Sequence, residues 1–158
     1  MRVVSLDQST KVTGYSYMLD GEYVESGIID MSKSKLETDA RSFEMAKAIW
    51  NVLKHYKPDH LILEETQQQS NVKTVIILSR LQGMIIGYAA AHGVKTHIVQ
   101  PSKWRAALQF VQGPKVKRAE LKQQSLDYVK EHVGRELPED ESEACCLGIA
   151  AHKIYDFE

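Results

Sequence analysis

Five carboxylates stand where predicted strands end or a predicted helix begins. They are Asp7, Glu64, Glu65, Asp140 and Glu143. Asp7 ends one hydrophobic strand, and Glu64 and Glu65 end another, so these side chains emerge at the same sheet edge if the strands are neighbours. The three-residue spacing of Asp140 and Glu143 places both on one face of a helix. The pattern therefore predicts a cage of four carboxylates, formed by Asp7, Glu64, Asp140 and Glu143.

Carboxylates held this close repel one another, which raises their pKa values unless hard divalent cations neutralise them. Clusters of oxygen ligands of this kind bind Mg²⁺ or Mn²⁺. Two such ions about 4 Å apart activate a water molecule and stabilise the leaving oxygen of an in-line phosphodiester displacement. We therefore expect a metal-dependent nuclease.

Each acid also has a purely structural explanation. An Asp at a strand end is commonly a turn residue, and acids in the first turn of a helix complement its dipole. The last helix favours the functional explanation, because the stripe of its two acids continues through apolar positions. These are Ala144, Leu147, Gly148, Ala151 and Ile154. Acids on a buried stripe need a reason, since burying an unpaired charge is costly.

Charge is unevenly distributed although the formal net charge is only −1. Residues 101–122 carry six basic side chains and one acidic side chain, whereas residues 127–143 carry seven acids and two basic side chains. Lys115, Lys117 and Arg118 lie where a helix is predicted to begin, and cations there oppose the helix dipole. An ordinary solvated helix start is the alternative; contacts with DNA phosphates explain the cations better.

Hydrophobic periodicity predicts the elements that must position these residues. Strands are expected over residues 2–7, 12–19 and 22–30, as an antiparallel meander with a hairpin at Asp20-Gly21. Two further strands, 60–63 and 94–99, alternate with helices over 38–56 and about 71–92, which implies parallel pairing. Short helices around 102–108, 116–132 and 139–155 follow. The order predicts an α/β fold with a five-stranded mixed sheet flanked by helices.

Length and composition predict a single domain over residues 1–158, with a core of ordinary size for 43% hydrophobic residues. We expect no membrane association, because no apolar run approaches the roughly 20 residues of a bilayer span. The opening residues 1–7 have the pattern of a strand and lack the features of a signal peptide, so a cytoplasmic protein is expected. Helix 71–92 is apolar on more than one stripe, which favours contact with a second subunit.

Other chemistry-bearing residues form no recognisable site. The six histidines lack metal-ligand spacing and pair with no nucleophile. Cys145 and Cys146 are adjacent on a helix, which favours buried, reduced packing residues. Trp104 and Phe110 could stack on bases, but their helical spacing is more typical of core residues, so we leave them out of the predicted site.

Four motifs, in order, resemble the RuvC family of Holliday junction resolvases, within the RNase H-like superfamily. They are residues 5–15 with Asp7 and Gly14, Leu63-Glu64-Glu65, Leu81-Gln82-Gly83 with Pro101-Ser102, and Asp140-Glu141-Ser142-Glu143-Ala144. The resemblance implies an RNase H-like fold and a homodimer that nicks four-way DNA junctions symmetrically. It also implies that Asp7, Glu64, Asp140 and Glu143 are the catalytic metal ligands, with Glu64 preferred to Glu65, and that Lys115, Lys117 and Arg118 contact phosphates.

Three departures indicate a divergent, phage-type member. Glu143 stands where the family more often has Asp, and Gln8-Ser9 replaces the usual Pro-Gly after the first ligand. Thr66, Gln67, Gln68 and Gln69 stand where cellular members often carry a stacking aromatic, so Gln67 is expected to contact DNA without strict sequence preference.

Three other functions remain as alternatives. Asp7 followed by Ser9, Thr10 and Gly14 is also similar to the first phosphate motif of actin-like ATPases and sugar kinases, but a second Gly-rich phosphate segment is missing. Another RNase H-like nuclease, acting on RNA–DNA hybrids or pre-rRNA, would use the same acids. A junction-binding dimer without catalysis would not need all four carboxylates.

Overall fold

A computed structural model describes residues 1–67 and 71–157. In these two ranges, five strands form one mixed sheet: β1 (Arg2–Asp7), β2 (Val12–Leu19), β3 (Glu22–Asp30), β4 (His60–Glu64) and β5 (Lys95–Val99). Their order across the sheet is β3-β2-β1-β4-β5. The first three strands pair antiparallel, whereas β1–β4 and β4–β5 pair parallel. The predicted meander with added parallel strands is therefore confirmed.

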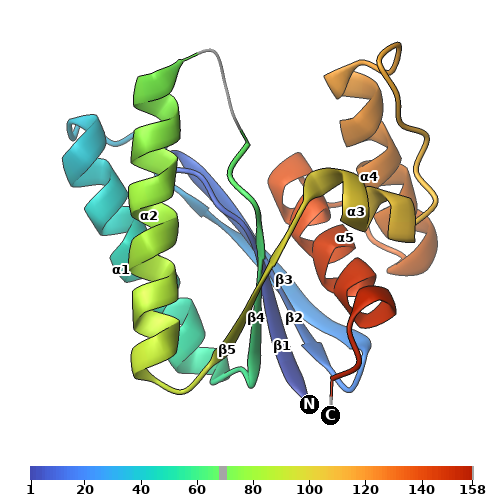
Figure 1. Cartoon of the computed structure of the whole chain (residues 1–158), viewed down its shortest axis with the longest axis horizontal. Coiled ribbons are helices and arrows are strands. Elements are labelled where there is room, and N and C mark those ends of the chain that lie inside the picture. The colour runs from blue at the N-terminus through green and yellow to red at the C-terminus, as the bar shows by residue number, and fades with distance from the viewer. Residues whose placement is uncertain (68–70, 158) are drawn as a thin grey trace.

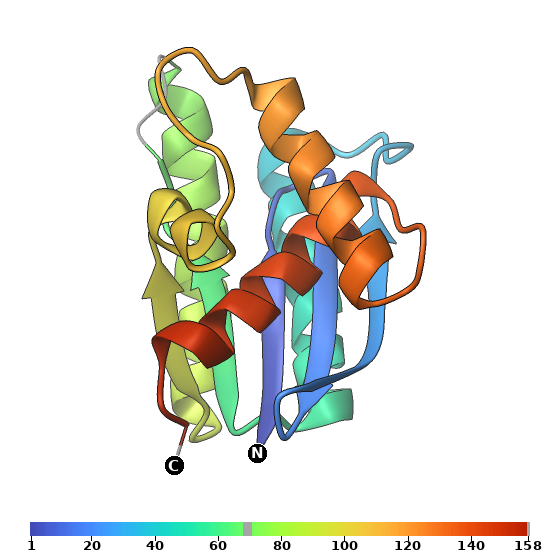
Figure 2. The same cartoon turned by 90° about the vertical axis from the view of Figure 1, so that its right-hand side faces the viewer.

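Within the described residues, five helices cover the two faces of this sheet. They are α1 (Thr38–Tyr56), α2 (Val72–Ala91), α3 (Pro101–Ala107), α4 (Arg118–His132) and α5 (Glu139–Ile154). Figure 1 shows α1 and α2 on one face and α3, α4 and α5 on the other, and Figure 2 shows α5 lying across the sheet. Each element begins and ends within two residues of its predicted position.

Alternating side chains of β1 and β4 supply a core to each helical layer. Val4, Leu6, Leu61 and Leu63 pack toward α1 and α2, whereas Val3 and Ile62 pack toward α5. All six are fully buried, as expected for central strands of a sheet covered on both faces. Cys145 and Cys146 are free, reduced and fully buried in the second core, as predicted.

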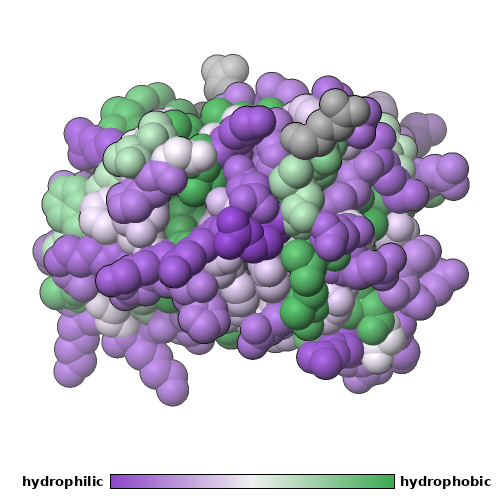
Figure 3. Space-filling model, turned by 90° about the horizontal axis from the view of Figure 1, so that it is seen from below, coloured by the Kyte–Doolittle hydropathy of each residue, from purple (hydrophilic) through white to green (hydrophobic). Residues whose placement is uncertain are grey.

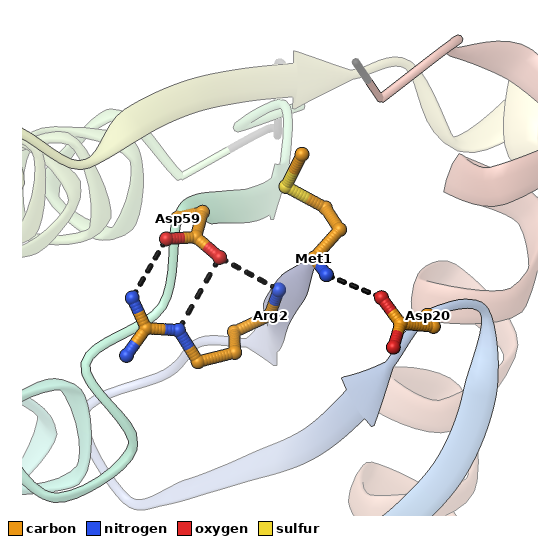
Figure 4. A network of polar contacts seen from close by, with 4 residues as sticks. All are labelled: Met1, Arg2, Asp20 and Asp59. Atoms are coloured by element: carbon orange, nitrogen blue, oxygen red, sulfur yellow. Dashed lines mark hydrogen bonds and ion pairs between the residues drawn. The ribbon is translucent and has the colours of Figure 1, made fainter.

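The end of the sheet at which β1 starts is fixed by ion pairs. The Arg2 guanidinium and backbone N–H donate three hydrogen bonds to Asp59, two of them 2.8 Å long (Figure 4). These bonds hold the pKa of Asp59 at about 2. The N-terminal ammonium pairs with Asp20 in the β2–β3 turn. Asp7 and Glu64 lie at the other end of β1 and β4.

Helix α2 has the length and apolar composition of a membrane-spanning helix. This finding differs from the expectation that no apolar segment is long enough to span a bilayer. That observation alone carries little weight, because core helices of globular proteins meet the same criterion. Only 22% of its apolar window is buried. One side, with Leu81, Ile85 and Ala89, packs into the core, and the remaining apolar surface includes Val72, whose exposed fraction is 67%.

Candidate active site

Sheet register brings the first two predicted acids together. Leu6 pairs with Leu63 across the parallel β1–β4 ladder, so Asp7 and Glu64 are the next residues on adjacent strands. Both strands run toward the same edge, because parallel strands present their carboxyl ends together. This edge is the upper end of the sheet in Figures 1 and 2.

Close packing between α5 and β2 brings the other two acids to the same edge. Gly14 of β2 is the residue that pairs with Asp7 of β1. A Cβ atom built on Gly14 would lie only 2.0 Å from the backbone oxygen of Asp140, so the first turn of α5 rests directly on the glycine. A residue with any side chain would hold the helix further away. Asp140 and Glu143 thus reach Asp7 because residue 14 is glycine.

These four carboxylates line one cleft of about 580 Å³, together with Glu65 and Glu139. Among the described residues, no three His, Cys, Asp or Glu side chains are grouped closely enough to hold a metal ion. The predicted cage of four carboxylates is therefore not formed in this structure, although the four acids line the same cleft. Their role as metal ligands stays a prediction.

Burial and neighbouring charges raise the pKa values of all four acids in the cleft. Burial, followed by the charges of Glu64, Glu143 and Asp140, raises the pKa of Asp7 well above its usual value. Burial also raises the pKa of Glu143 to about 7, with Arg105 opposing the shift and Glu64 adding to it. The pKa values of Glu64 and Asp140 are raised as well, again chiefly by burial.

This donor set fits a divalent metal. Burial raises the pKa of all four acids, and neighbouring acids of the site add to that rise at Asp7 and Glu143, a penalty that a hard cation would remove. Glu64 is the carboxylate that adds most to the rise in the pKa of Asp7. The preference for Glu64 over Glu65 as a metal ligand stays a prediction.

Trp104 holds Glu64 in place, a role that its pattern in the sequence did not reveal. The predicted burial of this tryptophan is correct, since its exposed fraction is 0%. Its indole Nε1–H nevertheless donates a 2.7 Å hydrogen bond to Glu64 Oε2. A buried indole N–H needs such an acceptor. Because the indole binds Oε2, the Oε1 atom of Glu64 does not share this hydrogen bond.

Three cationic side chains line the cleft: Arg105, Arg118 and Lys122. Arg118 was predicted. Arg105 and Lys122 were counted in the basic segment but not assigned to the site, although their charges lower the pKa values of acids in it. Lys122 also pairs with Glu139 at 2.6 Å.

The other predicted DNA-binding residues differ in whether they line the cleft. Gln67 lines the cleft, and its amide donates to the backbone oxygen of Glu65 at 3.3 Å. Lys115 and Lys117 are not among the lining residues; the backbone N–H of Lys117 donates to Glu120 at the start of α4. Gln68 and Gln69 lie outside the described residues.

A family profile described as "Lactococcus phage M3 protein" matches residues 1–144. The chain belongs to this family. Membership in the Lactococcus phage M3 protein family agrees with the expectation of a phage-type protein.

Curated relatives of this family member carry the name crossover junction endodeoxyribonuclease RuvC. The protein of Syntrophomonas wolfei is 25% identical over 99% of the chain and 90% of the relative. That of Mycobacterium ulcerans is 29% identical over 68% of the chain and 61% of the relative. The resemblance to RuvC is therefore confirmed.

Solved structures confirm the RNase H-like fold of the M3 family member. Thermus thermophilus RuvC in complex with a Holliday junction substrate superimposes with a TM-score of 0.78, at 14% identity, over 97% of this chain and 93% of that one. The yeast mitochondrial Holliday junction resolvase Ydc2 gives a TM-score of 0.63, also at 14% identity, over 96% and 78%.

Proposed function

We propose that the chain is a structure-selective endonuclease that resolves four-way DNA junctions by divalent-metal-dependent phosphodiester hydrolysis. The observation that carries the proposal is the convergence of Asp7, Glu64, Asp140 and Glu143 from β1, β4 and α5 in one cleft with Arg105 and Arg118. Curated relatives named crossover junction endodeoxyribonuclease support the substrate class.

The four carboxylates would hold Mg²⁺, with Mn²⁺ as a substitute, at two ions per site. When bound, these ions supply water activation and stabilisation of the leaving oxygen. The remaining work falls to the chain itself. Trp104 fixes the rotamer of Glu64, and the contact of α5 with Gly14 fixes the position of Asp140. Such fixed side chains spare the site reorganisation during the reaction.

Cationic side chains of the cleft bind the phosphodiester itself. Arg105, Arg118 and Lys122 face the same space as the acids, so they offset repulsion between DNA phosphates and carboxylates. Lys115 and Lys117 continue this basic surface beyond the cleft, and Gln67 offers an amide at its rim. Charge also develops on the scissile phosphate as it reacts, and the two arginines are placed to stabilise it.

A homodimer is part of the proposal, because resolution needs two cuts. The outward side of α2 presents Val72, Gly83 and Ala90, all exposed. A Cβ atom on Gly83 would meet nothing within 4 Å, so this position can accept a close neighbour from outside the chain. Small residues of this kind let two helices approach closely. The protein would act on DNA in the cytoplasm.

Cleavage of a synthetic four-way junction, with duplex, fork and RNA–DNA hybrid controls, tests the proposal. We expect paired nicks near the crossover that require Mg²⁺ or Mn²⁺ and that disappear with Asp7→Asn, while junction binding persists. Cutting of the hybrid alone would assign the chain to another RNase H-like activity. Metal-independent binding without cutting would favour a non-catalytic junction-binding dimer, and cleavage by Asp7→Asn would refute the assigned site.

A further inference from the structure

A second hollow of about 840 Å³ lies beside the acidic cleft, on the other side of the β1–β2 turn. It is bounded by that turn and by the first turns of α1 and α2, which begin at the same end of the sheet as the acids (Figures 1 and 2). Ser9 and Leu78 line both hollows, so the two are adjacent along the surface. We call this second hollow the α1–α2 groove.

Cations outnumber acids in the α1–α2 groove. Its basic residues are Lys11, Arg41, Lys73 and Arg80, and its acidic residues are Glu37 and Asp39. Among the described residues, Arg80 pairs with Asp39 at 3.5 Å, and both side chains are more than half exposed. Lys11, Arg41 and Lys73 form no ion pair with another described residue, which leaves their charges available to an anion.

Arg41 is the cation of the groove whose side chain is held in one orientation. Its side chain is half-buried, and its Nη2 donates to Thr10 Oγ1 at 3.3 Å, which orients the guanidinium. Its Nε is buried and has no hydrogen-bond partner among the described residues. The Thr10 contact therefore holds the terminal nitrogens of Arg41, rather than its buried Nε, as the part of the guanidinium that can meet an anion.

Hydroxyls accompany these cations. Thr38 and Thr74 line the groove from the two helices, beside Lys73. Lys and Arg together with Ser and Thr are the side chains that contact nucleic-acid backbones without reading sequence. Residues 73, 76, 77 and 80 share the side of α2 that faces the groove, as their spacing of three and four requires. The exposed Gly83 is not part of it.

We infer that the α1–α2 groove binds the phosphodiester backbone of a DNA segment that extends from the acidic cleft, through Lys11, Arg41 and Lys73. The inference rests on the proposed function and extends it, because it names a second contact that branched DNA makes with each subunit. Backbone contacts of this kind position a substrate without specifying its sequence. They would hold one arm while a phosphate of the junction lies among the carboxylates.

Binding of a fluorescent four-way junction, measured by anisotropy against salt concentration in an Asp7→Asn background, tests this inference. The groove variant combines Lys11→Ala, Arg41→Ala and Lys73→Ala. Loss of three phosphate contacts should weaken binding roughly tenfold or more near 0.1 M salt and reduce the salt slope by about 2 to 3. Thermal unfolding and sedimentation of the same variant report its folding and oligomeric state.

Two matched variants make the result specific. Lys54→Ala with Lys95→Ala and Lys153→Ala removes three exposed lysines at the opposite end of the sheet, and binding should change less than twofold. Figure 3, which shows that end, presents a mostly hydrophilic surface with scattered apolar groups. Lys11→Arg with Arg41→Lys and Lys73→Arg keeps the charges and should keep most of the salt slope.

Different failures have different meanings. If the parent chain binds and cuts junctions but the groove variant binds as tightly, with the same salt slope, the inference is wrong and the proposed function stands. A groove variant that loses its dimer instead of its DNA affinity would assign the groove to the subunit interface and overturn the inference. If the parent chain neither binds nor cuts branched DNA, both fail.

Discussion

Replacement of Gly14 by Ala should disable the active site without unfolding the protein. The new Cβ would lie 2.0 Å from the Asp140 backbone oxygen and 2.7 Å from the Glu141 nitrogen, where real Cβ atoms stay beyond 3.0 Å. The first turn of α5 must therefore move by at least 1.0 Å, and Asp140 moves with it. The backbone of Gly14 itself does not require glycine, since its φ is not positive.

The expected loss follows from that displacement. Catalytic groups need placement within about 0.5 Å, and an error of about 1 Å costs about 100-fold in rate. Overpacking of this kind also costs about 1–3 kcal/mol of stability. Single-turnover cleavage of a four-way junction at saturating protein measures the rate, and urea unfolding measures the stability. DNA affinity should change little.

Gly148→Ala is the matched control, because it adds the same methyl group between α5 and the sheet. There the nearest atoms belong to side chains, Ser5 Oγ at 2.7 Å and Met18 Cε at 2.9 Å, and the contact lies more than one helical turn beyond Glu143. It should lose similar stability yet keep its cleavage rate within a few-fold. A folded Gly14→Ala protein that cuts at the parent rate would refute the reasoning, as would equal loss of rate in both variants.

Three further predictions concern the site and the subunit contact. Trp104→Phe removes the 2.7 Å bond to Glu64 and should weaken Mn²⁺ binding, followed by calorimetry, by about 10- to 100-fold; unchanged affinity would mean that the indole only fills space. In EDTA, the raised pKa of Glu143, from 4.5 unfolded to about 7 folded, contributes stability that is present at low pH and lost as pH rises through that window. Glu143→Gln should therefore gain stability relative to the parent between pH 5 and 7 (urea unfolding), and parallel pH profiles would contradict this assignment. Gly83→Glu, which meets nothing within 4 Å in the monomer, should shift a dimer to monomers in sedimentation at unchanged monomer stability; a persistent dimer would exclude this side of α2 from the interface.

The fold and the position of the four acids in one cleft could be predicted from the sequence, because both depend on local patterns. Asp7 and Glu64 end short strands made of continuous buried residues, and the parallel pairing of these strands places the two acids side by side. Glu143 follows Asp140 at helical spacing, so one helix delivers both. These inferences need no knowledge of which side chains touch.

Contacts between distant elements could not be predicted in the same way. Trp104 was correctly expected in the core, but whether its indole meets a carboxylate depends on how α3 docks against β4. Arg105 belongs to a basic segment, yet only the packed structure distinguishes cleft residues from solvated ones. His60 and His97 looked unrelated in sequence, whereas β4 and β5 place their ring nitrogens 2.8 Å apart.

The two buried cysteines make the protein convenient for chemical labelling. Cys145 and Cys146 are fully buried in the core beneath α5, and burial raises the thiol pKa of Cys145 to about 12 and that of Cys146 further. Only the thiolate reacts with maleimides or disulfide reagents. A single cysteine introduced on the surface can therefore carry a fluorophore or spin label while both native thiols stay in place. Modification of the native pair would then record each opening of the core.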